Sequence, residues 1–112
     1  MPGLDKDKIY RAFADAVNMA PAELEEWLDT EESRKVGWKA DGRSESIGHA
    51  SGRRIVRLLR TPEHELADDD YRHMRKVVGY VHRHLAQRPQ GDVTRSRWRY
   101  SLLNWGHDPL LD

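Results

Sequence analysis

The arginine-rich stretch HASGRRIVRLLR, residues 49–60, is the first candidate for chemistry in this chain. Arg53, Arg57 and Arg60 are spaced by four and then three residues, which places them on one face of a helix, whereas Arg54 is rotated by about 100° from Arg53. No acidic residue lies within the stretch, and a row of unpaired cations attracts phosphate groups or clustered carboxylates. The alternatives are a solvated helix face and a face paired with acidic residues elsewhere in the chain.

A second basic row follows on the strongest predicted helix, residues 69–87. Arg72, Lys76 and Arg83 lie on one flank of this helix, with Gly79 among them. Because glycine has no side chain, we expect another element to approach the backbone there. This element would be a neighbouring helix of the same chain. If the row binds a ligand, it would instead be a nucleic-acid backbone or a helix of a partner protein.

The segment TRSRWRYSLLNW, residues 94–105, interleaves arginines with aromatic rings, a combination suited to stacking on bases. However, Trp98 and Trp105 share the face that should point to the core, and we expect them to be buried. The predicted surface for phosphate contacts is therefore drawn from basic side chains alone. These are Arg53, Arg54, Arg57, Arg60, Arg72, Lys76, Arg83, Arg95 and Arg97, extended by Lys39 and Arg43.

The six histidines suggest a metal site, but their spacing does not support one. His82 and His84 are about 200° apart on a helix and cannot bind the same ion there. The chain has no cysteine, so thiolate ligation is excluded. We therefore predict neither a metal nor another cofactor, and we expect His49 and His107 to hydrogen-bond buried backbone groups.

Three acidic residues, Asp41, Glu45 and Asp108, could act as acids or bases if the fold arranged them for it. A small hydrolase or transferase would need a pocket that holds Glu45, His49 and a positioned partner. No nucleophile motif of the form G-x-S-x-G surrounds Ser51. We therefore expect no catalytic residue and a protein that is not an enzyme.

Charge is unevenly distributed along the 112 residues, although the formal net charge is zero. Residues 1–33 contain three basic and nine acidic residues, whereas residues 34–112 contain 16 basic and 10 acidic residues. The acidic part could pack on the basic part, oppose nucleic acid or bind a basic partner. The absence of cysteine and of a long apolar run favours a cytoplasmic protein without a membrane segment.

Apolar residues recur at helical spacing through most of the chain, and no run alternates as a strand would. We expect Ser44 or Ser46 to begin the helix that ends at Arg60, and Thr94 to begin the last helix. The expected fold is one all-α domain over residues 1–112, a compact orthogonal bundle of about five helices. Its parts are acidic helices over residues 4–29, a loop over 30–44, a basic helical part over 45–105 and a tail over 106–112.

The apolar side chains expected to form the core lie on one face of each helix. Gly48 and Gly52 flank this face on the first basic helix, where interior glycines indicate either close packing or a break. Gly106 is expected to end the last helix, and the tail to pack through Leu110 and Leu111. The expected core positions of the basic part are Ile47, Ser51, Ile55, Val56, Leu59, Tyr71, Met74, Val78, Val81, Leu85, Trp98, Leu102 and Trp105.

Three stretches resemble a family of small bacterial and fungal proteins that is designated a domain of unknown function and whose members often carry a DNA-binding label. They are GRSESIGHASGRRIVRLL, DDDYRHMRKVVGYVHRHLAQRPQGDV and RWRYSLLNWGHDPL. The resemblance extends from about Pro21 to Leu110. It implies that these stretches belong to one compact domain and that DNA is the expected ligand, and it identifies no catalytic or binding residue.

Together these features favour a nucleic-acid-binding protein without enzymatic activity, with DNA as the favoured ligand and phosphate groups as the contacts. The competing hypothesis is a protein interaction module. It could be a homodimer in which the acidic segment of one copy meets the basic segment of another. A partner of this kind would present an acidic surface to the arginine rows.

Overall fold

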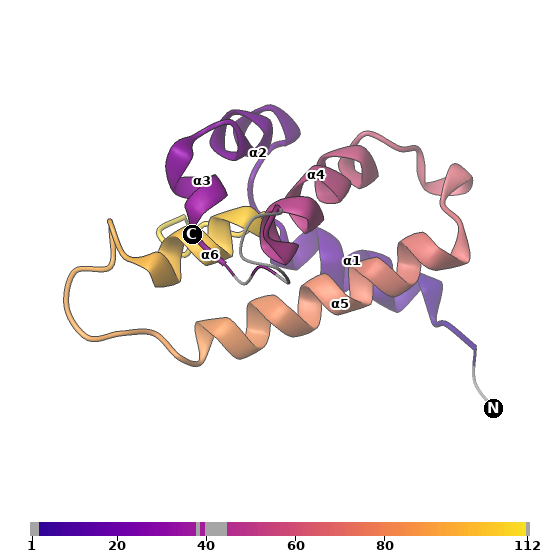
Figure 1. The fold of residues 1–112 in the computed structure, drawn as a ribbon. Helices are drawn as coiled ribbons and strands as arrows, with labels where there is room; N and C mark the ends of the chain where they lie inside the picture. The colour runs from indigo at the N-terminus through magenta and orange to yellow at the C-terminus, as the bar shows by residue number, and fades with distance from the viewer. Residues whose placement is uncertain (1–2, 38, 40–44, 112) are drawn as a thin grey trace.

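The fold is an all-α bundle, as predicted. The computed structural model describes residues 3–37, 39 and 45–111, and this part of the chain contains no strand. In chain order its helices, drawn in Figure 1, are α1 (Lys6–Ala16), α2 (Pro21–Leu28), α3 (Glu31–Lys35), α4 (Ile47–Leu59), the 3₁₀ turn η1 (Glu63–Glu65), α5 (Asp68–Leu85) and α6 (Arg97–Asn104). None of these helices has the length and apolar character needed to cross a membrane.

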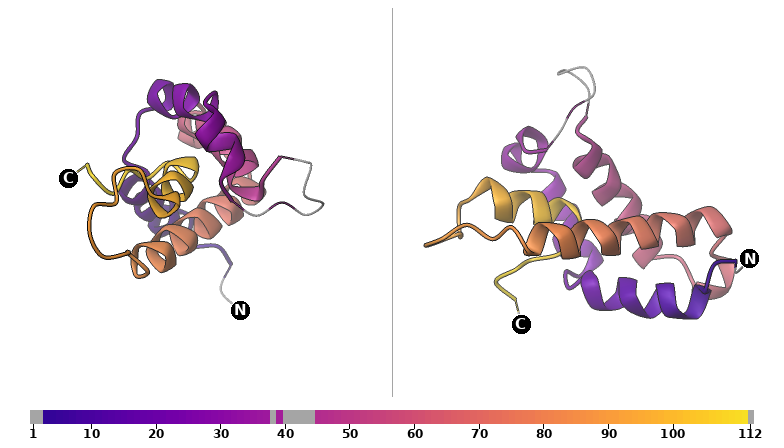
Figure 2. Two further views of the ribbon diagram at one scale, coloured as in Figure 1. Left: turned by 60° about the vertical axis from the view of Figure 1, so that its left-hand side comes forward. Right: turned by 90° about the horizontal axis from the view of Figure 1, so that it is seen from below.

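The longest helix, α5, supports the rest of the bundle. The helix α1 packs along α5, and α2 packs along α4. The short helix α6 lies between α5 on one side and α2 and α3 on the other, as the left view of Figure 2 shows. These contacts bury side chains from four helices almost completely: Leu24, Ile55, Met74, Val77, Val81 and Leu102.

Serine side chains begin the two helices that contain the first and the last basic segments. Ser46 caps α4 because its side-chain oxygen accepts the backbone N–H of His49 (3.1 Å), in agreement with one of the two predicted caps. The predicted cap at Thr94 is wrong, since Ser96 caps α6 through the same kind of contact (3.0 Å). Thr94 lies two residues before this cap, and its own N–H and hydroxyl both donate to the carboxylate of Asp92 (2.9 and 2.6 Å).

The segment predicted as the longest loop contains the additional helix α3. Thr30 caps it by accepting the N–H of Ser33 (3.1 Å), and its acidic and basic residues occupy its first and last turns, where they complement the helix dipole. Five residues are too few to show an apolar period, so the sequence pattern did not predict this helix. The alternative cap Ser44 and the predicted contact Arg43 lie outside the described residues.

Most of the predicted core is buried, but four positions differ, among them Leu59 and Leu85, which are only partly buried. At the centre of α5 the fully buried residue is Val77, whereas Val78 is half-buried. Ile47, predicted to face the core, is 44% exposed because it begins α4 at the edge of a cavity. Helical periodicity thus identifies the buried face correctly but not every residue at its border.

The tail after α6 is held by polar contacts rather than by its leucines. Gly106 ends α6 with a φ of +81°, as expected for a glycine stop. The side-chain amide of Asn18 then binds both the carbonyl oxygen (3.0 Å) and the N–H (2.7 Å) of Asp108. Leu110 and Leu111 extend beyond this point and are 44% and 45% exposed, so the prediction that the tail packs through them is wrong.

Gly52 permits a close approach between three helices. A Cβ at this position would lie 2.5 Å from the carbonyl oxygen of Asn104 on α6 and 2.6 Å from Cδ2 of Leu28 on α2. The helix α4 is continuous through both of its glycines. Of the two explanations for these glycines, close packing rather than a break is therefore confirmed.

Candidate functional site

The arginines of α4 converge on a groove between α2 and α4. The groove encloses about 1120 Å³. All four arginines of the predicted row line it, together with one arginine of α3: Arg34, Arg53, Arg54, Arg57 and Arg60. Three acidic side chains line it from α2 and the residue that follows it: Glu25, Glu26 and Asp29. The structure thus brings the first predicted row together, but in a groove of mixed charge.

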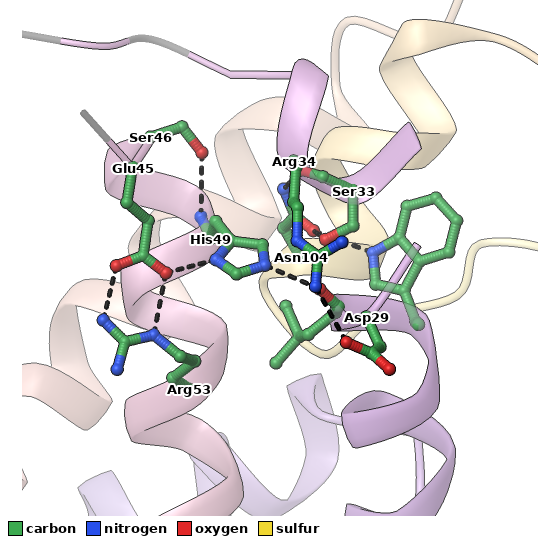
Figure 3. Close-up of polar contacts among 10 residues, drawn as sticks. Asp29, Ser33, Arg34, Glu45, Ser46, His49, Arg53 and Asn104 are labelled. Carbon is green, nitrogen blue, oxygen red and sulfur yellow. Dashed lines mark hydrogen bonds and ion pairs between the residues drawn. The ribbon is translucent and has the colours of Figure 1, made fainter. Parts of the chain in front are cut away.

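Glu45, His49 and Arg53 form a polar cluster at the beginning of α4 (Figure 3). The carboxylate of Glu45 accepts hydrogen bonds from Nε of Arg53 (2.7 Å) and from a terminal nitrogen of the same guanidinium, and it contacts Nδ1 of His49. The hydrogen bond from Arg53 is the main cause that lowers the pKa of Glu45 to about 2, against the opposing effect of burial. Glu45 is therefore ionised near neutral pH and neutralises Arg53.

The second ring nitrogen of His49, Nε2, lies 2.7 Å from the carbonyl oxygen of Leu28, the last residue of α2. Both ring nitrogens of His49 are thus engaged by groups of the same chain. The prediction that His49 hydrogen-bonds buried backbone is confirmed, and so is that for His107, whose Nδ1 binds the carbonyl oxygen of Ala16 (2.7 Å). With neither nitrogen left free, the geometry of His49 offers no general base to a substrate.

The other arginines of this row differ in whether a carboxylate lies close to them. Arg60 forms a two-pronged ion pair with Glu25 of α2 (3.1 and 3.2 Å). Arg54 is turned toward α5, where it contacts the carboxylate of Asp70 (3.4 Å). Among the described residues no carboxylate lies within ion-pair distance of Arg57. Three of the four arginines in the row are therefore neutralised within the chain.

A second polar cluster, centred on Asn104, was not predicted from the sequence (Figure 3). Asn104 is 1% exposed. Its Oδ1 accepts hydrogen bonds from Nε1 of Trp27 (2.8 Å) and from the hydroxyl of Ser33, and its Nδ2 donates to the carbonyl oxygen of Ser33 (3.0 Å). One asparagine thus joins α2, α3 and α6. An asparagine between two leucines and a tryptophan, in the stretch LLNW, is the sequence signal that could have indicated it.

On α5 the predicted row separates into paired and unpaired cations. Arg72 donates to Asp69 on the same helix (2.7 Å), whereas Lys76 and Arg83 have no carboxylate within ion-pair distance in the part of the chain that the structure describes. A Cβ on Gly79 would lie 3.0 Å from Nη1 of Arg83. The guanidinium of Arg83 therefore occupies the space at Gly79, and the expectation that another element approaches the backbone there is wrong.

Lys76 and Arg83 line a second cavity, which we call the α5–α6 cavity. Its volume is about 290 Å³. The described residues that line it come from α5, from α6 and its C-terminal end, and from the beginning of α4 and Gly37: Gly37, Ile47, Gly48, Lys76, Tyr80, Arg83, Ser101, Asn104 and Trp105. These lining residues include two cations and no carboxylate. The α5–α6 cavity is therefore cationic, in contrast to the mixed charge of the groove between α2 and α4.

Five nearly parallel rings run along the contact between α5 and α6. In order they are His73, Trp105, Tyr80, His84 and Trp98, with tilts of 13–16° between neighbours. The guanidinium of Arg88 lies 5.3 Å from the centre of the last ring. Trp98 and Trp105 are 7% and 3% exposed, so they belong to the core as predicted. Because they are buried and stacked on protein groups, they are poor candidates for stacking on bases.

Arg95 and Arg97 flank the capping residue Ser96 at the beginning of α6. Both arginines are exposed, and neither has a carboxylate within ion-pair distance among the residues described. Arg97 precedes Ser101 by one helical turn, which places it on the side of α6 that faces the α5–α6 cavity. Lys39, the other predicted extension that the structure describes, is half-exposed.

Asp108, one of the candidate acids, is engaged in an ion pair. It accepts two hydrogen bonds from the guanidinium of Arg99 (3.1 and 3.0 Å). Burial is the largest single influence and raises the pKa of Asp108, but the hydrogen bonds from Arg99 and from the backbone of Leu110, together with the positive charge of Arg99, outweigh it and lower that pKa. The candidate Asp41 lies outside the described residues. Within residues 3–37, 39 and 45–111, no three histidine or acidic side chains are grouped so that they could hold a metal ion.

Comparison with protein families identifies one model that covers most of the chain. The model, described as a protein of unknown function (DUF3140), matches residues 12–103. No curated protein and no solved structure gave a match. The function therefore has to be inferred from the residues and their geometry.

Proposed function

The chain belongs to the family of unknown function DUF3140, and we propose that it binds nucleic acid, with DNA as the favoured ligand, through phosphate contacts and without catalysing a reaction. The observation that carries this proposal is the separation of paired from unpaired cations. Four of the nine predicted contact residues form ion pairs with carboxylates of the same chain: Arg53, Arg54, Arg60 and Arg72. The other five are paired with none among the described residues: Arg57 on α4, and Lys76, Arg83, Arg95 and Arg97 on α5 and around the beginning of α6.

Unpaired cations contribute more to phosphate binding than paired ones. An arginine bound to a carboxylate must exchange that partner before it can bind a phosphate, so its net gain is small. An unpaired surface cation neutralises a phosphate directly and releases a counterion from the nucleic acid. We therefore place the proposed contact surface on α5 and the beginning of α6 rather than on α4.

The distribution of carboxylates supports this choice in a chain whose formal net charge is zero. Glu25, Glu26 and Asp29 line the groove between α2 and α4, where they oppose phosphate. The α5–α6 cavity has no carboxylate among its described lining residues. A local surplus of positive charge can bind phosphates although the whole molecule is neutral.

The test is fluorescence anisotropy of a labelled, mixed-sequence DNA duplex titrated with the protein at several salt concentrations. Replacing Lys76, Arg83 or Arg97 by alanine should weaken binding to unrelated sequences about equally and reduce the salt slope by about 1 per lost contact. Arg60→Ala is the matched control, because it removes an arginine that is already paired with Glu25. It should leave the salt slope nearly unchanged.

Two results would contradict the proposal. One is the absence of binding even at low salt. The other is a loss of affinity in Arg60→Ala equal to that in Arg83→Ala, because paired and unpaired cations would then contribute alike.

A protein partner is the second candidate, and the mixed charge of the groove between α2 and α4 is the observation that favours it. Arg57 lines this groove without an ion-pair partner among the described residues, while Glu26 lines it from α2. A partner with both signs of charge, or a second copy of this chain, would match such a surface. Sedimentation velocity at rising salt tests this candidate: a dimer that dissociates as salt rises, without affinity for DNA, would favour it.

A further inference from the structure

We infer that the α5–α6 cavity is a binding site for a compact phosphomonoester, that is, a dianionic phosphate attached to one flat apolar group. The inference goes beyond the proposed binding of nucleic acid, because it concerns a small ligand in a defined cavity. Three features carry it: the charge of the lining residues, a hydrogen-bond donor without an acceptor among the described residues, and an apolar edge.

The charge of the cavity matches a dianion. Its charged side chains are Lys76 and Arg83, and no carboxylate is among the described residues that line it. Neither cation has an ion-pair partner within the described part of the chain, so both can face a ligand. A phosphomonoester carries a charge of about −1.5 to −2 at neutral pH, which two cations balance. A ligand with a single carboxylate would balance only one of the two cations.

Gly79 leaves room for the guanidinium of Arg83 to reach the cavity. Nη1 of Arg83 lies 3.0 Å from the position that a Cβ on Gly79 would occupy, so the side chain folds back along α5 to the cavity that it lines. A planar guanidinium can donate two parallel hydrogen bonds to phosphate oxygens. Lys76, one turn before residue 80 on the same helix, adds a compact ammonium charge.

Trp105 supplies a hydrogen-bond donor that no described residue uses. Its Nε1 has no acceptor among the described residues, and Trp105 lines the cavity. Gly48 makes the arrangement possible, since a Cβ there would lie 3.0 Å from Nε1. The indole N–H thus adds a neutral donor to the two cationic ones.

An apolar edge completes the cavity. Ile47 is 44% exposed at the beginning of α4 and lines the cavity together with Gly37. The rings of Tyr80 and Trp105, which also line it, are stacked with their centroids 4.2 Å apart. The volume of about 290 Å³ lies at the lower limit of small-molecule sites, roughly 300–1,000 Å³. A phosphate with one ring therefore fits better than a larger ligand.

Phenyl phosphate is the probe, titrated into nitrogen-15-labelled protein without nucleic acid and followed by NMR. We expect a saturable shift of the indole N–H signal of Trp105, and we expect Lys76→Ala and Arg83→Ala each to weaken affinity about tenfold or more. Arg75→Ala is the matched control, because it removes an exposed cation next to Lys76 that does not line the cavity. This control should change affinity less than about twofold.

Two further probes test the assigned ligand chemistry. Inorganic phosphate lacks the flat group, and benzoate has a single negative charge, so we expect both to bind roughly tenfold more weakly than phenyl phosphate. Equal affinity for inorganic phosphate would overturn the role of the apolar edge. Equal affinity for benzoate would overturn the match between a dianion and two cations.

The site itself would be overturned by the absence of a saturable shift, or by a loss of affinity in Arg75→Ala as large as that in Lys76→Ala. The dispersion of the other NMR signals verifies that each variant is folded, so a loss of affinity is not confused with unfolding. Since the titration contains no nucleic acid, it is independent of the DNA measurement. Binding of phenyl phosphate without binding of DNA would retain this site and contradict the proposed function alone.

Discussion

Nε2 of His49 lies 2.7 Å from the carbonyl oxygen of Leu28, so an imidazole of α4 is bound to the last residue of α2. The other ring nitrogen contacts Glu45, and the carboxylate of Glu45 is bound in turn by Arg53. These four residues form a continuous polar chain from an exposed guanidinium to the backbone of another helix. A basic stretch that suggests a ligand surface in the sequence therefore serves, in this part, to hold two helices together.

Loss of this polar chain should destabilise the fold. His49→Ala removes both ring contacts and leaves the carbonyl oxygen of Leu28 without its donor. We expect the free energy of unfolding to fall by about 2–3 kcal/mol, because an unsatisfied buried polar group costs about 1–3 kcal/mol and the packing of the ring is lost as well. Urea denaturation followed by circular dichroism measures this change.

The control for this prediction is His82→Ala, which changes an exposed histidine of α5. Its effect should stay within about 0.5 kcal/mol, as for most surface substitutions. If both variants were as stable as the natural protein, the contact between His49 and Leu28 would contribute nothing to the fold.

Helix positions could be predicted from the sequence because amphipathic periodicity is a local property. Met74 and Val81 follow helical spacing on α5 and are buried. Caps are less predictable, because the pattern locates the first residue of a helix only to within one or two residues. Ser46 caps its helix, whereas α6 is capped by Ser96, two residues after the predicted Thr94.

Ion pairing could not be predicted, because it depends on which helices face each other. Glu25 and Arg60 are 35 residues apart in the sequence and meet because α2 packs along α4. The space at Gly79 could not be assigned either, for a different reason: the conformation of the Arg83 side chain on the same helix decides what fills it. The positions of the cations along the chain therefore did not reveal which of them are paired within the fold.

His73 should make stability depend on pH below neutrality. Burial is the main cause that lowers the pKa of His73 from 6.5 to about 4, and the positive charge of Arg54 adds to it. The Nε2 of the ring lies 2.9 Å from the hydroxyl of Ser51. Between these two pH values the unfolded chain binds a proton at this position and the folded protein does not. Stability should therefore fall as the pH falls through this window.

Urea midpoints measured from pH 7 to pH 4 test this dependence. The natural protein should show a decreasing midpoint, and His73→Gln should remove part of the decrease because glutamine does not titrate. The same decrease in both proteins would assign the pH dependence to other groups. Carboxylates with lowered pKa values, such as Glu45, contribute mainly at the acidic end, between pH 4.5 and about 2.

Gly52 and Gly79 should respond oppositely to the same substitution. In both helices alanine is intrinsically favoured over glycine by about 1 kcal/mol. At Gly52, however, the new Cβ would lie 2.5 Å from the backbone oxygen of Asn104, which cannot move without separating α4 from α6. We expect Gly52→Ala to lower the free energy of unfolding by about 2 kcal/mol or more, as measured by urea denaturation. A stable Gly52→Ala variant would contradict the close packing of these helices.

Gly79→Ala should keep the fold and weaken the binding of phenyl phosphate. Its Cβ would meet only the end of the flexible side chain of Arg83, at 3.0 Å, so stability should be unchanged or rise by up to about 1 kcal/mol. The guanidinium would have to move away from the position in which it lines the α5–α6 cavity, and we expect a loss of affinity in the same direction as in Arg83→Ala. The NMR titration of the two variants side by side measures it. Full affinity in Gly79→Ala together with a loss in Arg83→Ala would show that the ligand needs the charge of Arg83 but not its position over the glycine.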